Sequence, residues 1–527
     1  MFLVIGSGPA GVACSAALLA RGAQVTMVDG GVTLDGLRRE ALDRLRRLPP
    51  SRWTGADAAF VKEGTDASPA GIPLKLAYGS SYPYDDPVGQ PITTVGAESK
   101  PSWARGGLSA VWGAAVLPYR DEDLRGWPIS ESDLAPHYRS ILAMVPTSGR
   151  EDAIAELFPL HTDRPAPPRS SSQASSLLGD VRRNGASARS AGMWIGASRL
   201  AMRSQPAAGD DGCVQCGLCM YGCPAGLIYN STSTLEMLQS DPRFVYRTGL
   251  VVERLVEEAG HVRACARDVA TGSNDDILAD RVFVGAGVLG STRLLLASLE
   301  AYGEHVTMKD SCYFLLPLVR YRSDRDAAIE PRHTLAQVFV ELVDPAISPH
   351  TVHLQVYTHN ELYRMAIAGV LGPLDQIFGG IVERVALSRL LLIQGYLHSD
   401  QSAEIDVTLD HPTSRAPALR LVGRDNPAML PALGAVVAKL RAQRSILRAL
   451  PAGPLLRVGK PGRGFHSGGT LPMRRHPGRL ETDTMGRPGG TGRVHVIDAS
   501  VFPSIPATTI TLSVMANAHR IGTEAVA

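Results

Sequence analysis

The chain has 527 residues, of which 44% are hydrophobic and 20% charged, which is ordinary for a soluble globular protein. Its 53 basic and 51 acidic residues leave a formal net charge of +2, so the composition indicates no nucleic-acid partner. No run of about 18 apolar residues is present, and we expect no transmembrane segment. The N-terminus lacks the features of a signal peptide, which favours a cytoplasmic protein. Export with a partner subunit and peripheral membrane association stay open.

Residues 2 to 30 have the pattern of a strand, a tight turn, a helix and a second strand. "FLVIGSG" is apolar up to Gly6, "AGVACSAALLARG" has helical composition, and "AQVTMVDGG" forms the second strand. Gly6, Gly8 and Gly11 give G-x-G-x-x-G in this context, and Asp29 follows about 18 residues later. Such glycines let backbone N–H groups approach a pyrophosphate, and the acid accepts hydrogen bonds from ribose hydroxyls. The unit predicts dinucleotide binding.

The middle of the chain changes character after a second strand, glycine turn and helix in "DRVFVGAGVLGSTRLLLAS". Between residues 310 and 410, "AQVFVELV", "HTVHLQVY" and "EIDVTL" alternate apolar and polar residues, which is typical of an antiparallel sheet with two different faces. In "HTVHLQVY" the polar face carries His353, Gln355 and Tyr357. The sequence does not decide whether this face meets solvent or substrate. A long helix is predicted from Asn426 to Leu447.

Four ordered stretches together resemble the glucose–methanol–choline (GMC) oxidoreductases: "GSGPAG", "ARGGLSAVWGAAV", "FHSGGT" and "VIDASVFPSIPATTITLSVMANAHRI". The resemblance implies an α/β protein with a non-contiguous Rossmann-type FAD-binding domain and an α+β substrate domain built on an antiparallel sheet. It places the FAD lobe at residues 1–309, with a cysteine-rich loop at 212–224. The substrate domain then covers 310–455, and 456–527 return to the FAD domain with active-site residues.

The resemblance also implies which residues hold the cofactor. The ADP half lies against Gly6, Gly8, Gly11 and Asp29, the flavin lies along Gly106, Gly107, Ser109 and Trp112, and Ala286, Gly287 and Asp498 complete the site. Members that bind flavin covalently do so through a histidine in the glycine-rich loop. Because "ARGGLSAVWG" contains no histidine, we expect non-covalent FAD.

His466 matches the family's active-site histidine. Alcohol oxidation requires hydride transfer to flavin N5 and removal of the hydroxyl proton, a task that suits an imidazole. The second active-site position, usually His or Asn, falls on Thr509, or on Thr508 if the count slips by one residue. A threonine can donate or accept a hydrogen bond but cannot act as a base near neutral pH. His519 and Asn517 on the closing helix are expected to be structural.

The remaining motif is "CVQCGLCMYGCP", which holds four of the seven cysteines: Cys213, Cys216, Cys219 and Cys223. Its spacing is that of the bacterial ferredoxin run C-x2-C-x2-C-x3-C-P, whereas zinc usually draws two pairs from separate loops. The stretch resembles a loop that carries an iron–sulfur cluster in some GMC sugar dehydrogenases. We therefore expect a 3Fe–4S or 4Fe–4S cluster. Redox-active or disulfide-bonded cysteines, zinc and inert thiols are the alternatives.

These features predict an FAD-dependent dehydrogenase that oxidises a CH–OH group of a sugar, glycoside or other alcohol, with His466 as the base. A cluster would pass single electrons to an acceptor protein such as a cytochrome. Two alternatives stay open: an oxygen-using alcohol oxidase with structural cysteines, and a flavin-binding electron-transfer subunit whose catalysis has decayed, an idea that Thr509 motivates.

Overall fold

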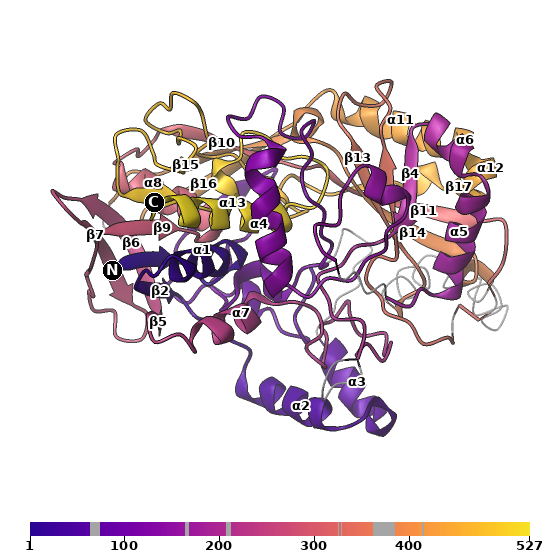
Figure 1. Cartoon of the computed structure of the whole chain (residues 1–527), viewed down its shortest axis with the longest axis horizontal. Coiled ribbons are helices and arrows are strands. Elements are labelled where there is room, and N and C mark those ends of the chain that lie inside the picture. The colour runs from indigo at the N-terminus through magenta and orange to yellow at the C-terminus, as the bar shows by residue number, and fades with distance from the viewer. Residues whose placement is uncertain are drawn as a thin grey trace.

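A computed structural model describes residues 1–63, 74–163, 168–206, 212–324, 326–327, 329–361, 385–413 and 416–526. Within those ranges no helix is long and apolar enough to span a membrane. The described chain forms a mixed α/β structure with several sheets, in which the two termini lie in the same lobe (Figure 1).

The first lobe is built on a five-stranded parallel sheet in the order β20-β9-β1-β2-β5. The strands are β1 (Phe2–Ile5), β2 (Val25–Asp29), β5 (Phe244–Thr248), β9 (Arg281–Val284) and β20 (Val494–Val496). Helices α1 (Pro9–Ala20) and α8 (Gly287–Ser298) follow β1 and β9 directly, as in a Rossmann-type fold. Three distant segments of the chain therefore meet in one sheet, which confirms the predicted fold class.

Two further sheets pack within this lobe. The strands β6 (Leu250–Glu257), β7 (Val262–Asp268) and β8 (Ile277–Ala279) form an antiparallel sheet. The other sheet has the order β19-β10-β15-β16-β3, with β19 (Ser467–Gly468), β10 (His305–Asp310), β15 (Glu404–Leu409), β16 (Leu419–Arg424) and β3 (Ile92–Val95). Its apolar face shares a buried cluster with Leu289 and Leu296 of α8.

The second lobe holds a seven-stranded sheet with the order β17-β11-β14-β13-β12-β4, and β18 pairs with β11. These strands are β4 (Met193–Ala197), β11 (Tyr313–Arg320), β12 (Val338–Leu342), β13 (Val352–Tyr357), β14 (Leu390–Tyr396), β17 (Ala449–Pro451) and β18 (Arg457–Val458). On this side of the molecule lie the helices α5 (Ser172–Arg183), α6 (Gly185–Ser190), α11 (Met429–Ala442) and α12 (Arg444–Leu447) (Figure 1).

The sheet memberships refine what alternation alone predicted. "EIDVTL" is a two-faced antiparallel strand as expected, but as β15 it pairs with β10 in the first lobe. Its apolar residues Ile405, Val407 and Leu409 are buried with side chains of α8. Conversely, β4 lies before residue 309 in the chain but pairs with β12 in the second lobe. The alternation of apolar and polar residues predicts which face of a strand is buried, but it does not predict which sheet the strand joins. The domain boundaries stay predictions.

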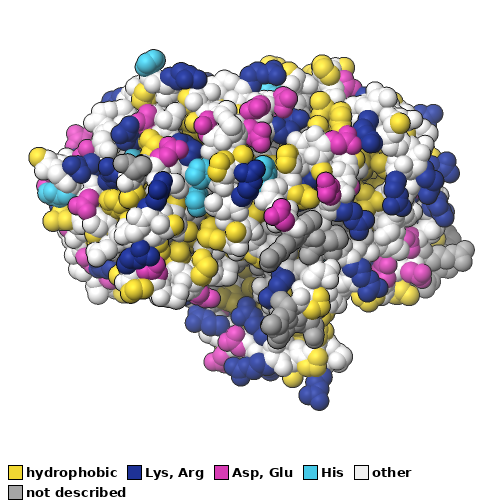
Figure 2. Space-filling model, viewed as in Figure 1, with side chains coloured by type: hydrophobic (Ala, Val, Ile, Leu, Met, Phe, Trp, Pro, Cys, Tyr) yellow, Lys and Arg dark blue, Asp and Glu magenta, His cyan; other side chains and the backbone are white. Residues whose placement is uncertain are grey.

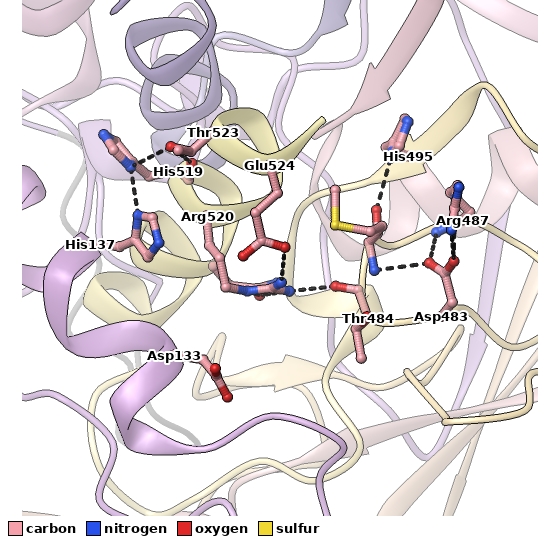
Figure 3. A network of polar contacts seen from close by, with 12 residues as sticks. Asp133, His137, Asp483, Thr484, Arg487, His495, His519, Arg520, Thr523 and Glu524 are labelled. Atoms are coloured by element: carbon pink, nitrogen blue, oxygen red, sulfur yellow. Dashed lines mark hydrogen bonds and ion pairs between the residues drawn. The ribbon is translucent and has the colours of Figure 1, made fainter. Parts of the chain in front are cut away.

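The closing helix α13 (Thr511–Glu524) packs against α1 and α4 (Glu131–Met144). Helix α4 begins at a capping box formed by Ser130 and Asp133. Figure 3 shows His137 of α4 facing His519 of α13, with 2.9 Å between their Nδ1 atoms. Arg520 donates to Asn517 Oδ1 and to Glu524 within the same helix. His519 thus contacts α4 across the helix interface, and Asn517 accepts a hydrogen bond within its own helix, contacts that fit the structural role expected for them.

Helices α2 (Gly36–Arg47) and α3 (Gly55–Lys62) project from the lower side of the molecule in Figure 1, and α7 (Ser231–Leu238) lies between them and the first lobe. Leu42, Leu45 and Val61 of the projecting pair share a buried cluster with Leu218 and Tyr221 of the cysteine-rich loop. Basic and acidic side chains are interspersed over the face drawn in Figure 2, in keeping with a net charge of +2.

Candidate active site

A cavity of about 520 Å³ runs through the first lobe, beside the carboxyl ends of its parallel strands. Ligands of open α/β sheets bind at this edge, because helix N-termini and their free N–H groups face it. Predicted cofactor residues line this cavity: Gly6, Gly8, Asp29, Gly107, Ala286, Gly287 and Asp498. The structure thus brings together residues from four separate segments of the chain.

The first turn, between β1 and α1, has the close packing that its glycines permit. Gly6 has φ +100°, and a Cβ on it would lie 2.4 Å from the carbonyl oxygen of Gly285. Gly11 does not line the cavity; a Cβ there would meet the carbonyl oxygen of Gly6 at 1.8 Å. Gly11 therefore allows the helix to approach the strand, while Gly6 and Gly8 leave backbone at the cavity wall.

Asp29 lies at one end of the cavity, and its carboxylate has hydroxyl partners. Ser7 donates to Oδ2, and the hydroxyl of Tyr246 donates to Oδ1 at 2.7 Å. Burial raises the pKa of Asp29, and the hydrogen bonds from Ser7 and Tyr246 oppose that rise. An acceptor surrounded by hydroxyl donors is suited to ribose hydroxyls.

The glycine-rich loop 104–116 reaches the same cavity through Gly107, while its other predicted residues support the loop from behind. The Gly106 N–H donates to Ser7 Oγ at 2.9 Å, and the buried Ser109 hydroxyl accepts from the Ser231 N–H at 3.0 Å. Trp112 donates from Nε1 to the carbonyl of Tyr229 at 2.7 Å. Gly106, Ser109 and Trp112 are outside the cavity lining.

The third wall comes from β9 and β20. Ala286 and Gly287 begin α8, and Asp498 follows β20. Asp498 accepts from the Ser291 hydroxyl at 2.5 Å and from the Ser500 N–H at 3.0 Å, so it joins α8 to the returning C-terminal segment. Burial raises the pKa of Asp498.

His466 sits between Phe465 and Ser467, both of which line the cavity. Its ring stacks on Tyr396 of β14, with centroids 4.5 Å apart, and its Nδ1 is buried without a hydrogen-bond partner. Desolvation lowers the pKa of His466 to about 3, and the charge of His353 contributes. The imidazole is therefore neutral at physiological pH and keeps a lone pair for a proton.

The loop around His466 is fixed by Asp310 at the end of β10. Asp310 accepts from Ser467 Oγ at 2.7 Å and from the Gly462 N–H at 2.8 Å, while the Ser311 N–H donates to the His466 carbonyl at 3.0 Å. Burial raises the pKa of Asp310 to about 7.

Thr509 and Thr508 are both buried but differ in their contacts. Thr509 Oγ1 accepts from the Leu117 N–H at 2.7 Å, just beyond the glycine-rich loop. The Thr508 hydroxyl has no hydrogen-bond partner. Ala507 is buried with Tyr396 and Tyr313, so the 507–509 segment lies next to the ring on which His466 stacks.

The polar face of β13 is buried, and the alternative that it meets solvent is wrong. His353, Gln355 and Tyr357 are 0%, 3% and 3% exposed. Tyr357 packs with the core of the first lobe, and its hydroxyl lies 3.6 Å from where a Cβ on Gly113 would be. The face therefore covers the glycine-rich loop from the second lobe.

The four clustered cysteines come close together beside this loop. Cys219 is buried in the core of the first lobe, and all four are free thiols. Burial raises the pKa of Cys219 to about 12 and that of Cys216 to about 11, and the neighbouring cysteines raise both further. Among the described residues, no three cysteine sulfurs lie within 4.8 Å of one another. Zn–S bonds of 2.3 Å would require sulfurs about 3.8 Å apart, so this is not a preformed zinc site.

Residues outside the motifs support the cysteine-rich loop. Lys75 Nζ donates to the Trp112 carbonyl at 2.8 Å and lies close enough to Cys219 for their charges to interact. Burial lowers the pKa of Lys75 to about 8. The Tyr78 hydroxyl donates to the Cys223 carbonyl at 3.0 Å, and Thr334 Oγ1 accepts from the Met220 N–H at 3.3 Å. These partners are isolated in sequence, so no motif could have identified them.

One other group of potential metal ligands is present in the described ranges, formed by His350, His398 and Asp400. The His398 Nδ1 atom already accepts from the Asp400 N–H at 3.1 Å. The imidazole rings of His350 and His398 stack with their centroids 3.5 Å apart. These contacts account for the group as a hydrogen-bonded cluster.

Comparisons with known proteins agree with this geometry. Residues 456–518, which contain His466, Asp498 and Thr509, match the family described as GMC oxidoreductase. The crystal structure of pyridoxine 4-oxidase from Mesorbium loti is similar, with a TM-score of 0.60 and 15% identity over 99% of this chain and 98% of that chain. No curated protein sequence matches significantly.

The likeness in structure concerns the fold, while the matched segment concerns the part of the chain that carries His466. Together they indicate an FAD-dependent oxidoreductase, and residues 456–518 are similar to the GMC oxidoreductases. The residues present fit FAD: a buried acceptor at Asp29, a turn at Gly6 that excludes a Cβ, and one continuous cavity from Asp29 to Ser467.

Proposed function

We propose that this protein oxidises a CH–OH group of a small alcohol or sugar, with His466 taking the hydroxyl proton. One observation carries the proposal: the two residues that flank His466 line the same cavity as Gly6, Gly8 and Asp29. A dinucleotide held by the glycine turn would therefore extend toward the histidine. FAD, when bound, accepts the hydride from the carbinol carbon.

The environment of His466 supports this role. The imidazole is neutral because it is desolvated, and its Nδ1 has no protein partner. Asp310 and Ser311 fix the backbone on both sides, so the ring can be aimed without large loop motion. Thr509 cannot replace it, because its oxygen accepts from the Leu117 N–H and a hydroxyl is not a base near neutral pH.

An anaerobic screen tests this function. The purified holoenzyme is mixed with a panel of sugars, polyols and alcohols that includes pyridoxine, and the flavin absorbance near 450 nm is followed. At least one alcohol should bleach the flavin in wild type, and His466→Ala should slow that bleaching about 10²–10⁴-fold at unchanged FAD content. If no alcohol in a broad panel bleaches the flavin, this proposal is wrong, and the alternative of a flavin-binding electron-transfer subunit without catalytic activity replaces it.

We further propose that Cys213, Cys216, Cys219 and Cys223 hold a 3Fe–4S or 4Fe–4S cluster that carries electrons out to a one-electron acceptor protein. Their spacing supports a cluster, and so does their proximity without the tight convergence that a single zinc ion needs. Lys75 joins the loop to the Trp112 carbonyl, so the cysteines lie near the segment that reaches the cavity. The sugar-dehydrogenase branch of the family is part of this proposal.

Metal analysis decides the matter. Anaerobic wild-type protein should contain about three or four irons per chain. Cys216→Ser should lose this iron, while the matched control Cys265→Ser, in β7 and outside the loop, should keep it. Flavin reduction by the alcohol should survive in Cys216→Ser, whereas transfer to a cytochrome should fail. Iron-free protein from an iron-replete anaerobic preparation would rule out the cluster.

The second candidate is an oxygen-using alcohol oxidase with structural cysteines. It is favoured by the similarity of the whole fold to a protein named as an oxidase. Peroxide measured under air separates the two: a dehydrogenase should release little peroxide for each alcohol oxidised, and an oxidase should release one equivalent.

A further inference from the structure

A row of aromatic and ionisable side chains crosses the sheet of the second lobe directly above the glycine-rich loop. The strand register places Glu341 of β12 opposite His353 of β13, His353 opposite Tyr396 of β14, and Tyr396 opposite Tyr313 of β11. All four side chains therefore share one face of the sheet. This is the face that covers the first lobe, since its neighbour Tyr357 packs with the core of that lobe.

Glu341 and His353 form an isolated pair within this row. Both are 0% exposed, and His353 Nδ1 lies 2.7 Å from Glu341 Oε1. An ionised carboxylate only accepts, so Nδ1 carries the proton and donates it. His353 Nε2 lies 3.1 Å from the Gln355 side-chain nitrogen, which therefore donates to it. The other carboxylate oxygen, Oε2, has no hydrogen-bond partner.

A buried carboxylate with one partner is costly unless its charge is used or offset. Arg199 is near enough to sense the charge of Glu341 but forms no ion pair with it among the described contacts. In the part of the chain that the structure describes, Glu341 therefore has no arginine or lysine as an ion-pair partner, unlike Asp180, which pairs with Arg320 at 2.5 Å behind the same sheet.

Tyr396 connects this pair to His466. Its ring stacks on His466 with an interplanar angle of 20° and on His353 with an angle of 21°. A positive charge on His353 would lower the pKa of His466, so the two imidazoles lie close enough to interact electrostatically. The other ionisable groups near these rings are Asp310, which fixes the His466 loop, Tyr313, which packs on Tyr396, and Tyr357, whose hydroxyl donates to Gln355.

We propose that Glu341 and His353 form a positioning pair that sets how readily His466 accepts the substrate's hydroxyl proton. When that proton arrives, His466 becomes an imidazolium in a desolvated site, and the carboxylate of Glu341 offsets the new charge across Tyr396. The pair supplies electrostatic support that Thr509, a neutral hydroxyl bonded to the Leu117 N–H, does not supply. This inference rests on the proposed alcohol oxidation.

The test is the protonation state of His466, measured without substrate by NMR of ring-labelled histidine and assigned by the signal that His466→Gln removes. His353→Gln replaces a neutral imidazole by a neutral amide and leaves the Glu341 carboxylate in place, so the pKa of His466 should change little. Glu341→Gln keeps an acceptor oxygen for Nδ1 but removes the negative charge, so the pKa of His466 should fall below its wild-type value. A lowered pKa in Glu341→Gln with little change in His353→Gln is the expected result, because a merely structural role would not make the effect follow the charge of the carboxylate.

Kinetics give the second readout. Oxidation requires neutral His466, so the acid limb of the pH–rate profile should move to lower pH in Glu341→Gln and stay in place in His353→Gln. In Glu341→Gln the rate of flavin reduction should fall about 10–100-fold at neutral pH with KM little changed, since the lost charge acts in the transition state. If His353→Gln does not fold, Glu341→Gln carries the test alone, because it preserves the hydrogen bond.

Asp180→Asn is the matched control: it also neutralises a buried carboxylate of the same lobe, but away from His466. It should lower stability and leave both the His466 titration and the pH–rate profile unchanged. The inference is overturned if wild type oxidises the alcohol while Glu341→Gln matches it in rate and titration, or if Asp180→Asn reproduces the Glu341→Gln effects. Wild type that reduces its flavin with no alcohol would instead overturn the proposed function.

Discussion

Replacing Gly6 by alanine tests whether the β1–α1 turn is built around a cofactor. Gly6 has φ +100°, a conformation that costs an L-residue about 1–3 kcal/mol. The added Cβ would also lie 2.4 Å from the Gly285 carbonyl oxygen and 2.9 Å from its carbon, both of them backbone atoms. One of the two turns that flank the cavity must therefore move. We expect a total cost of about 3 kcal/mol or more, which corresponds to FAD binding weaker by roughly 100-fold.

The assay is the ratio of FAD to protein after gel filtration, together with the thermal midpoint of the protein with and without added FAD. Gly434→Ala is the control, because Gly434 lies in α11 with no atom within 4 Å of its added Cβ. It should bind FAD normally and be more stable by up to about 1 kcal/mol. Gly6→Ala protein that retains full FAD content and the wild-type midpoint would refute this account of the turn.

Three further predictions concern the buried hydroxyl of Thr509, the buried ion pair of Arg320 with Asp180, and the half-buried imidazole of His137. Thr509→Ala removes the acceptor of the buried Leu117 N–H, so unfolding experiments should show a loss of about 1–3 kcal/mol, with a smaller effect on flavin reduction than His466→Ala. An equal loss of rate at both positions would show that their roles are misassigned. Arg320→Met leaves the buried Asp180 carboxylate with only the exposed Arg183 as an ion-pair partner, and should cost up to about 3 kcal/mol at unchanged FAD content; Arg320→Met with Asp180→Leu should recover most of it. Burial lowers the pKa of His137 to about 4 in the folded protein, so its contribution to stability should be full above about pH 6.5 and be lost as the pH falls toward 4. Because His137 is only half-buried, solvent screening limits this loss to about 1 kcal/mol, and a flat difference between wild type and His137→Gln from pH 8 to 4.5 would contradict it.

The sequence by itself determined the features that depend on local geometry. The turn at Gly6 needs a residue without a Cβ, and the helix start at Ser130 needs a short polar side chain, so both can be recognised from residue type and spacing. The alternation in β13 correctly separated an apolar face from a polar one. The order of four motifs was enough to predict the fold class and the C-terminal segment that carries His466.

Tertiary structure decided what these local features face. Alternation could not tell that His353 lies in the interior, because a buried polar face and a solvated one have the same sequence pattern. Nor could it place Tyr396 under His466 or Lys75 beside Cys219, since these partners come from segments that meet only when the sheets pack. Strand register and loop closure over long stretches of chain bring such groups together. Contacts of that kind depend on the whole fold and leave no signal at any fixed spacing in the sequence.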